Sequence, residues 1–232
     1  MPFLYSSNYL CFMLPAFLLT LLAQLYVSSA YRKWSQVRAA SGLTGEQAAN
    51  RLIQNGGLYG VRVEGVAGNL TDHYDPRTKV LSLSQGVYQS NSVASLAVAA
   101  HELGHAVQDN QGYFPLRLRA ALVPAANIGS MFGWVLIFIG LILRITELAW
   151  IGVAVFSLGA VFALATLPVE LNASSRAKRL LADSGMIVGE DEQRGVNNVL
   201  NAAAFTYIAA LLAAIMQLFY FISMVGGGSR RR

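Results

Sequence analysis

The stretch Ser92-Val-Ala-Ser-Leu-Ala-Val-Ala-Ala-His-Glu-Leu-Gly-His-Ala-Val-Gln108 decides how the rest of the chain has to fold. Its content of alanine, leucine and valine predicts a helix. Residues four apart lie one turn apart on the same face of a helix, so His101 and His105 can bind one metal ion. The His-Glu-x-x-His pattern also places Glu102 beside them, as a candidate base for catalysis.

Gly104 lies in the middle of this predicted helix, between the two histidines. A glycine inside a helix costs roughly 0.5–1 kcal/mol relative to alanine. We therefore expect that something else approaches the helix backbone closely at Gly104. Ser90 or Ser92 can cap the start of the helix.

The composition is that of a membrane protein. Of the 232 residues 55% are hydrophobic and only 12% are charged, whereas soluble proteins have about 25% charged residues. Four apolar segments are long enough to cross a bilayer as helices, and they cover residues 9–31, 122–143, 148–167 and 202–225. We expect a mainly α-helical polytopic membrane protein with a small α+β domain. The single cysteine, Cys11, excludes an internal disulfide.

The first apolar segment has a second interpretation, a cleaved signal peptide. Ser28-Ser29-Ala30 resembles a cleavage site, but no basic residue precedes the segment, as a signal peptide requires. We therefore favour an uncleaved membrane anchor.

Two polar regions lie between the spans. Residues 32–121 are expected to hold a helix over 44–57, strands over 60–66 and 79–84, and the helix that carries His101. In residues 168–201, Pro168 is expected to start a new helix. Residues 226–232 are expected to form a loose basic tail. Since only four residues lie between the second and third spans, these two should form a tight helical hairpin.

The distribution of basic residues predicts the topology. Residues 32–121 and 168–201 hold nine and four of the seventeen lysines and arginines, and basic loops stay in the cytoplasm. The two polar regions should therefore face the cytoplasm, although this places the basic C-terminal tail outside. Because the basic residues cluster beside apolar segments, the net charge of +5 does not indicate a nucleic-acid partner.

A hydrolytic zinc site takes three protein ligands, so one more is needed. The remaining histidine, His73, lies upstream between the strands. Asp109 follows His105 by four residues and can be a partner of a ligand or a surface residue. Glu170 is the strongest candidate, because it lies just after the third span, on the same side of the membrane as His101.

The chain resembles a known family at three places in the right order: Asp72-His-Tyr-Asp-Pro-Arg77, Ala99-Ala-His-Glu-Leu-Gly-His105 and Leu167-Pro-Val-Glu-Leu-Asn-Ala-Ser-Ser-Arg176. It is similar to the YugP-type zinc metallopeptidases of bacterial membranes and, in pattern, to the HtpX-like gluzincin proteases. The resemblance implies a gluzincin-like catalytic domain with one zinc ion per chain, held by His101, His105 and Glu170.

The chain departs from the HtpX-like pattern at Ser174, where an aspartate would stand. Asn172, Ser174 and Ser175 are possible substitutes for orienting a ligand histidine. The resemblance implies that Glu102 acts as the base in peptide-bond hydrolysis. A donor to the developing oxyanion is also needed; by residue type the candidates are His73, Tyr88 and Arg176.

A protein or peptide is the expected substrate. A strand near Lys79–Ser84 can pair with it by β-augmentation, or can simply pack the helix. Two other functions stay open: an inactive metal-binding scaffold that presents a membrane partner, and an intramembrane site-2-type protease. The second is disfavoured because polar residues flank the His101 helix too closely for a span. The sequence identifies no partner subunit.

Overall fold

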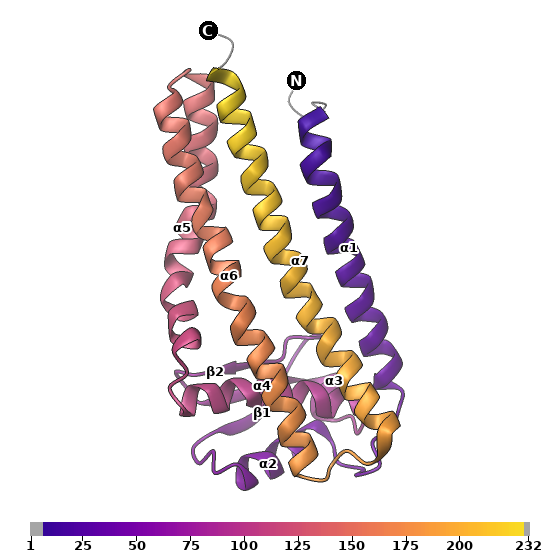
Figure 1. Ribbon diagram of the computed structural model, residues 1–232. Coiled ribbons are helices and arrows are strands. Elements are labelled where there is room, and N and C mark those ends of the chain that lie inside the picture. Colours follow the sequence, from indigo (N-terminus) through magenta and orange to yellow (C-terminus); the bar gives the residue numbers. More distant parts are fainter. Residues whose placement is uncertain (1–6, 230–232) are drawn as a thin grey trace. The chain divides into compact units, whose positions relative to one another are not determined.

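The computed structural model describes residues 7–229, which form seven helices and a three-stranded sheet (Figure 1). In chain order the elements are α1 (Ser7–Ser35), α2 (Gly45–Asn55), β1 (Arg62–Val66), β2 (His73–Asp75), β3 (Val80–Ser84), α3 (Gln85–Tyr88), α4 (Val93–Asn110), α5 (Phe114–Ile142), α6 (Thr146–Asp183) and α7 (Gly189–Ser229).

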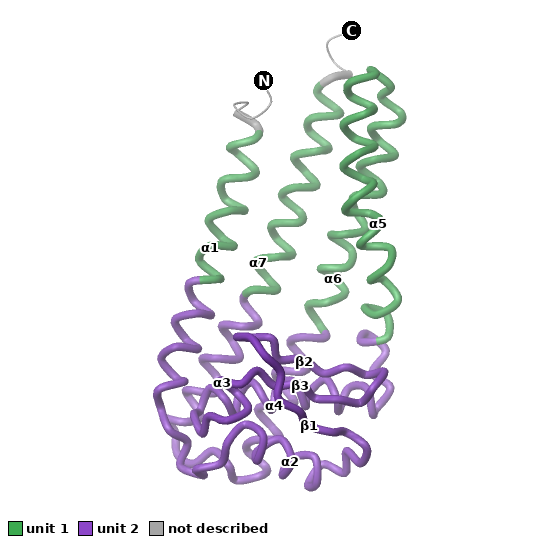
Figure 2. The backbone as a smooth tube through the Cα atoms, turned by 180° about the vertical axis from the view of Figure 1, so that it is seen from behind, with its two compact units in different colours: residues 1–24, 117–168, 206–232 green, residues 25–116, 169–205 purple. Residues whose placement is uncertain are grey.

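Four helices, α1, α5, α6 and α7, are long and apolar enough to cross a membrane. This confirms a mainly helical chain with four candidate membrane-spanning helices and a small sheet. The chain divides into two compact units, which are coloured separately in Figure 2. Unit 1 comprises residues 1–24, 117–168 and 206–232, and unit 2 comprises residues 25–116 and 169–205.

Unit 1 contains the predicted hairpin, in which α5 and α6 pack through glycines. A Cβ added at Gly133 would lie 2.7 Å from backbone atoms of Phe156, and one at Gly140 would lie 2.5 Å from the backbone nitrogen of Ala149. Small residues let membrane helices approach this closely. Phe221 of α7 is 1% exposed and packs edge-on against Phe156.

Two predictions about helix ends are wrong. Pro168 does not start a new helix but lies inside α6. A proline in a helix removes one backbone hydrogen bond, the one to the residue four positions earlier, and here the residues on both sides still continue the helix. Likewise Gly226 and its neighbours belong to α7, which extends to Ser229, so the loose tail does not begin there. The three final arginines lie outside the described residues.

Unit 2 contains the sheet, whose strand order is β1-β3-β2. β1 pairs with β3 in parallel, and β2 pairs with β3 in antiparallel fashion. The predicted strands over 60–66 and 79–84 are confirmed, whereas β2 has no counterpart among the predictions. β3 pairs with β1 over Val80–Ser84 and with β2 over Val80–Ser82, so substrate pairing near Lys79–Ser84 stays a prediction that these two neighbouring strands restrict. The edges of the sheet are β1 and β2.

The residues predicted to cap the starts of α2 and α4 are confirmed. Thr44 and Gln47 form a capping box at the start of α2, and Gly56 follows its end. Ser92 caps α4 by accepting a hydrogen bond from the backbone N–H of Ser95. α4 contributes more buried side chains to the unit 2 core than any other element, and the others come from α2, α3, β3, α6, α7 and connecting segments.

Candidate metal centre

The centre forms where α4 and the second half of α6 touch, within unit 2. A Cβ added at Gly104 would lie 2.5 Å from the backbone oxygen of Ala173. The two helix backbones can therefore meet only because residue 104 has no side chain. This confirms the expectation of a close approach at Gly104 and shows that the neighbour is the backbone of α6.

The contact brings three potential ligands together. The Nε2 atom of His101 lies 3.3 Å from Glu170 Oε2, and Nε2 of His105 lies 3.5 Å from the same oxygen. The ligand atoms of the three groups all lie within 4.8 Å of one another. The structure thus brings together the three residues that were predicted as ligands, although Glu170 follows His105 by 65 residues in the chain.

The chemistry of this group fits zinc. Two imidazole nitrogens and one carboxylate oxygen are a common ligand set for catalytic zinc, which keeps a further position open. Glu170 is only 2% exposed and His101 is 9% exposed. A buried carboxylate beside two imidazoles is an arrangement that a cation would stabilise.

Glu102 lies beside the centre on α4, with its side chain half-buried. Burial alone lowers the pKa of His105, but the hydrogen bond to Glu170 and the negative charges of Glu102 and Glu170 outweigh burial and raise this pKa above its ordinary value. The site is therefore electronegative, as a cation site must be.

Ser174 occupies the position that sequence comparison with the HtpX-like pattern singled out. Its Oγ lies 3.2 Å from Nδ1 of His101, one turn of α6 after Glu170. The hydroxyl can accept a hydrogen bond from Nδ1–H, which leaves Nε2 facing Glu170. Ser174 thus contacts His101 directly. Asn172 has no contact of this kind with His105, and Gln108 lies between the two.

The residue that sequence reasoning missed is Gln108. It is fully buried, and its Oε1 lies 3.0 Å from Nδ1 of His105. Its Nε2 donates to the backbone oxygen of Val169 and to Oδ1 of Asn172. A signal was available: Gln108 follows His105 by three residues and so shares its helix face.

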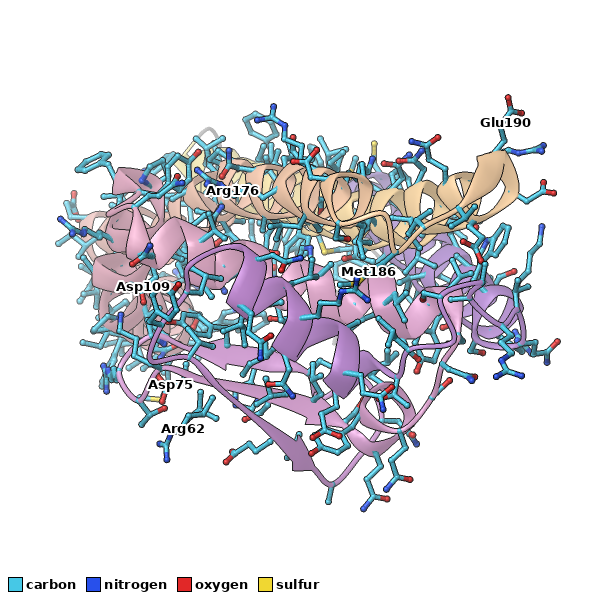
Figure 3. All side chains as sticks on the ribbon, turned by 90° about the horizontal axis from the view of Figure 1, so that it is seen from below. Arg62, Asp75, Asp109, Arg176, Met186 and Glu190 are labelled. Atoms are coloured by element: carbon cyan, nitrogen blue, oxygen red, sulfur yellow. The ribbon has the colours of Figure 1, made fainter. Side chains whose placement is uncertain are left out.

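Arg176 extends the same set of contacts. Its Nε donates to Oδ1 of Asn172 and its Nη1 donates to Oε1 of Gln111, both at 2.6 Å. The guanidinium also lies over the ring of Tyr113. Figure 3 shows Arg176 on α6 and, near the end of α4, Asp109.

The other two candidate oxyanion donors lie elsewhere. Tyr74, next to His73 on β2, donates to Asp109 of α4. Since successive side chains of a strand point to opposite faces, His73 faces away from α4; it is exposed, with Nδ1 2.8 Å from the Thr71 backbone oxygen. Tyr88 packs beside Gly65 of β1, and a hydrogen bond to Glu46 of α2 raises its pKa. His73 lies on β2 and Tyr88 on α3, and neither element carries one of the three potential ligands, which lie on α4 and α6.

Asp109 has a structural role. Its carboxylate accepts the 2.8 Å hydrogen bond from Tyr74 and forms an ion pair with Lys79, which precedes β3. Burial, the hydrogen bond to Asp109 and the nearby carboxylates raise the pKa of Tyr74, so this phenol stays protonated and donates. Asp109 therefore joins the end of α4 to the sheet.

Comparison with known proteins agrees with this geometry. Residues 9–226 match the family described as "Putative neutral zinc metallopeptidase". The chain belongs to this family. It is also 44% identical over 206 residues to "Putative membrane protease YugP" of Bacillus subtilis (strain 168), covering 89% of this chain and 91% of the relative. The resemblance predicted from the three motifs is thereby confirmed. No solved structure matches the chain.

Proposed function

We propose that this protein is a membrane-anchored zinc endopeptidase that hydrolyses peptide bonds in protein substrates. The observation that carries the proposal is the buried convergence of His101, His105 and Glu170, with Glu102 adjacent on the same helix. Membership of a family described as zinc metallopeptidases supports the choice of metal, and the single group of three ligands among the described residues leads us to propose one ion per chain. Donors from two packed helices would make unit 2 a gluzincin-like catalytic domain.

Zinc, when bound, supplies Lewis-acid chemistry, which polarises a peptide carbonyl and makes water a better nucleophile at neutral pH. Glu102 provides the proton transfers. Its carboxylate accepts a proton as water oxygen adds to the carbonyl carbon, and it gives that proton to the leaving amine nitrogen as the carbon–nitrogen bond breaks. A half-buried carboxylate beside the ligands is placed for both steps.

His73 and Tyr88 are poor candidates for the oxyanion donor, since His73 faces away from α4 and Tyr88 packs against β1 and α2. Arg176 lies on α6 with Glu170, but its Nε and Nη1 are engaged by Asn172 and Gln111. We therefore assign Arg176 to the support of the ligands rather than to the oxyanion.

An extended substrate can add to the edge of β2. This strand lies at one end of the sheet order and is joined through Tyr74 to α4, the helix of the ligand histidines. Backbone pairing at a sheet edge binds a chain with little dependence on its sequence. The outer edge of β2, the strand paired with Val80–Ser82, is thus the proposed place of β-augmentation near Lys79–Ser84.

The site is proposed to face the cytoplasm from a bacterial cell membrane. Residues 32–121 and 168–201, which include all the site residues, hold nine and four of the seventeen basic residues. The four candidate spans are α1, α5, α6 and α7, and α4 is not one of them. This favours a site outside the bilayer core over an intramembrane site-2-type protease.

Glu102→Gln tests the mechanism, with Glu190→Gln as the matched control, because Glu190 is an exposed residue at the start of α7 (Figure 3). Each protein is purified in detergent, its zinc content is measured, and cleavage of labelled casein and of membrane proteins is followed by mass spectrometry of new N-termini. We expect Glu102→Gln to keep about one zinc per chain and lose cleavage, while the control keeps both.

Cleavage by Glu102→Gln at the wild-type rate would remove the mechanism. Zinc binding with no cleavage by either protein would instead support the inactive scaffold. The orientation is tested in a Cys11→Ser background, because Cys11 is the chain's single cysteine. Tyr59→Cys, at a position that is 89% exposed, should react with an impermeant maleimide only after cell lysis, and Leu143→Cys, in the α5–α6 turn, should react in intact cells.

A further inference from the structure

His105 lies at the end of a continuous series of hydrogen bonds, whose other members are Gln108, Asn172 and Arg176. The distances are 3.0 Å from His105 to Gln108, 3.0 Å from Gln108 to Asn172 and 2.6 Å from Asn172 to Arg176. Gln108, in the middle, is fully buried and also donates to Val169 at 2.8 Å. All of these residues belong to unit 2.

The direction of every hydrogen bond in this series follows from its ends. The guanidinium of Arg176 can only donate, so Asn172 must present Oδ1 to it. The backbone oxygen of Val169 can only accept, so Gln108 must turn Nε2 toward it and toward Asn172 Oδ1. The remaining polar atom of Gln108 is Oε1, which accepts only, and it faces Nδ1 of His105.

We propose that Gln108 is a positioning residue that holds the proton of neutral His105 on Nδ1, and that Asn172 and Arg176 keep the Gln108 amide in the required orientation. With the proton on Nδ1, the lone pair is on Nε2, the nitrogen that faces Glu170 at 3.5 Å. This inference rests on the proposed function in one respect, since it presumes that Nε2 binds the metal.

The two ligand histidines are oriented by different means. His101 meets the hydroxyl of Ser174, which can either donate or accept, so Ser174 alone does not select a tautomer. His105 meets the amide oxygen of Gln108, and the orientation of this amide is fixed because its Nε2 donates to two acceptors, Val169 O and Asn172 Oδ1. The series therefore supplies at His105 what a carboxylate partner supplies in many metal sites, without adding a charge.

The test compares zinc affinity and tautomer, neither of which requires substrate. Zinc affinity is measured by chelator competition for the wild type, Gln108→Leu, Asn172→Leu and Asn172→Asp. We expect Gln108→Leu to bind zinc about 10–100-fold more weakly, the usual effect of removing such a partner. Asn172→Leu should have a smaller effect, because Val169 still holds the amide. Asn172→Asp keeps the acceptor oxygen and should stay close to the wild type.

The tautomer is read from ¹⁵N spectra of histidine-labelled, zinc-loaded protein. The chain has only three histidines, and a His73→Gln sample removes the third signal. We expect His105 to carry a protonated Nδ1 and a metal-bound Nε2. Gln111→Ala is the control: it removes an exposed partner of Arg176 that is not part of the path to His105, and it should change neither readout.

Two results would overturn the inference: wild-type zinc affinity in a folded Gln108→Leu protein, or a proton on Nε2 of His105 in the wild type. If Gln108→Leu does not fold, the contrast between Asn172→Leu and Asn172→Asp decides, and equal zinc affinities would overturn it. If the wild type binds no zinc, the proposed function fails, while the position of the proton on neutral His105 still decides whether Gln108 sets the tautomer.

Discussion

Replacing Gly104 with alanine should separate α4 from α6 and weaken the metal centre. The added Cβ would lie 2.5 Å from the oxygen and 3.1 Å from the carbon of the Ala173 carbonyl. These are backbone atoms of a helix, so they cannot move aside as a side chain would. Forcing an extra methyl group into a packed contact costs about 1–3 kcal/mol, against a gain of roughly 0.5–1 kcal/mol from replacing glycine in a helix.

The central values give a net loss of about 1 kcal/mol, with an upper limit of about 2.5 kcal/mol. A loss of about 1 kcal/mol corresponds to a decrease in Tm of about 2–4 °C for a chain of this size. Zinc affinity should fall as well. Ala173 follows Glu170 by one turn of α6, and Gly104 lies between the two ligand histidines, so the same separation moves Glu170 away from them. Metal–ligand distances tolerate only about 0.2 Å of error, and we expect at least a tenfold loss of affinity.

Thermal unfolding in detergent and chelator competition measure the two effects. The matched control is Gly159→Ala, another change in the middle of a helix, where an added Cβ meets nothing within 4 Å. The control should keep zinc affinity and lose no stability. If Gly104→Ala matches this control in both Tm and zinc affinity, then the close approach of α4 and α6 does not hold the site together.

Three further predictions concern single groups. Glu170→Gln should weaken zinc binding by more than the roughly 10–100-fold typical of a residue that only supports a ligand, as chelator competition would show; a smaller loss would argue against Glu170 as a ligand. Tyr74→Phe should cost about 1 kcal/mol in thermal unfolding, because it removes the hydrogen bond to Asp109, and it should leave zinc content unchanged. In the metal-free protein, burial of the ring lowers the pKa of His105, but the hydrogen bond to Glu170 and the charges of Glu102 and Glu170 outweigh burial, so the pKa is raised. A histidine whose pKa is higher in the folded than in the unfolded protein stabilises the fold fully at a pH below its unfolded pKa of about 6.5. This stabilisation is lost as the pH rises through the pKa of the folded protein. The Tm of the metal-free wild type should therefore fall between pH 6 and 9 by more than that of His105→Gln, and zinc affinity should rise over the same interval. Parallel Tm curves for the two proteins would contradict this.

Local signals account for the parts of the structure that could be predicted. The caps at Thr44 and Ser92 and the spacing of His101 and His105 each depend on residues within about one helical turn. Gly104 is an intermediate case: its cost in a helix indicated a close neighbour, but not which one. Glu170 could be proposed only because two spans of similar length return the chain to the same side of the membrane.

The features that could not be predicted depend on contacts distant in sequence. β2 is three residues long, too short for its alternation to be recognised, and it exists because it pairs with β3. Pro168 considered alone predicts the start of a helix, but α6 continues through this residue. The spacing of three residues from His105 places Gln108 on the ligand face of the helix, but it does not reveal the partners that fix the amide, because Val169 and Asn172 follow Gln108 by 61 and 64 residues.

The polar part of α6 illustrates why the site depends on a register between helices. Glu170, Ala173, Ser174, Ala177 and Leu181 are all buried, and their spacing places them on one face of the helix. This face carries a ligand, the contact with Gly104 and the partner of His101. One residue of slip rotates a helix by about 100°, which would remove all three at once. The Ala173–Gly104 contact and the Glu170 ligand are therefore two consequences of the same register. For this reason Gly104→Ala should cost little further zinc affinity in a Glu170→Gln background, and a fully additive loss in the double variant would contradict this coupling.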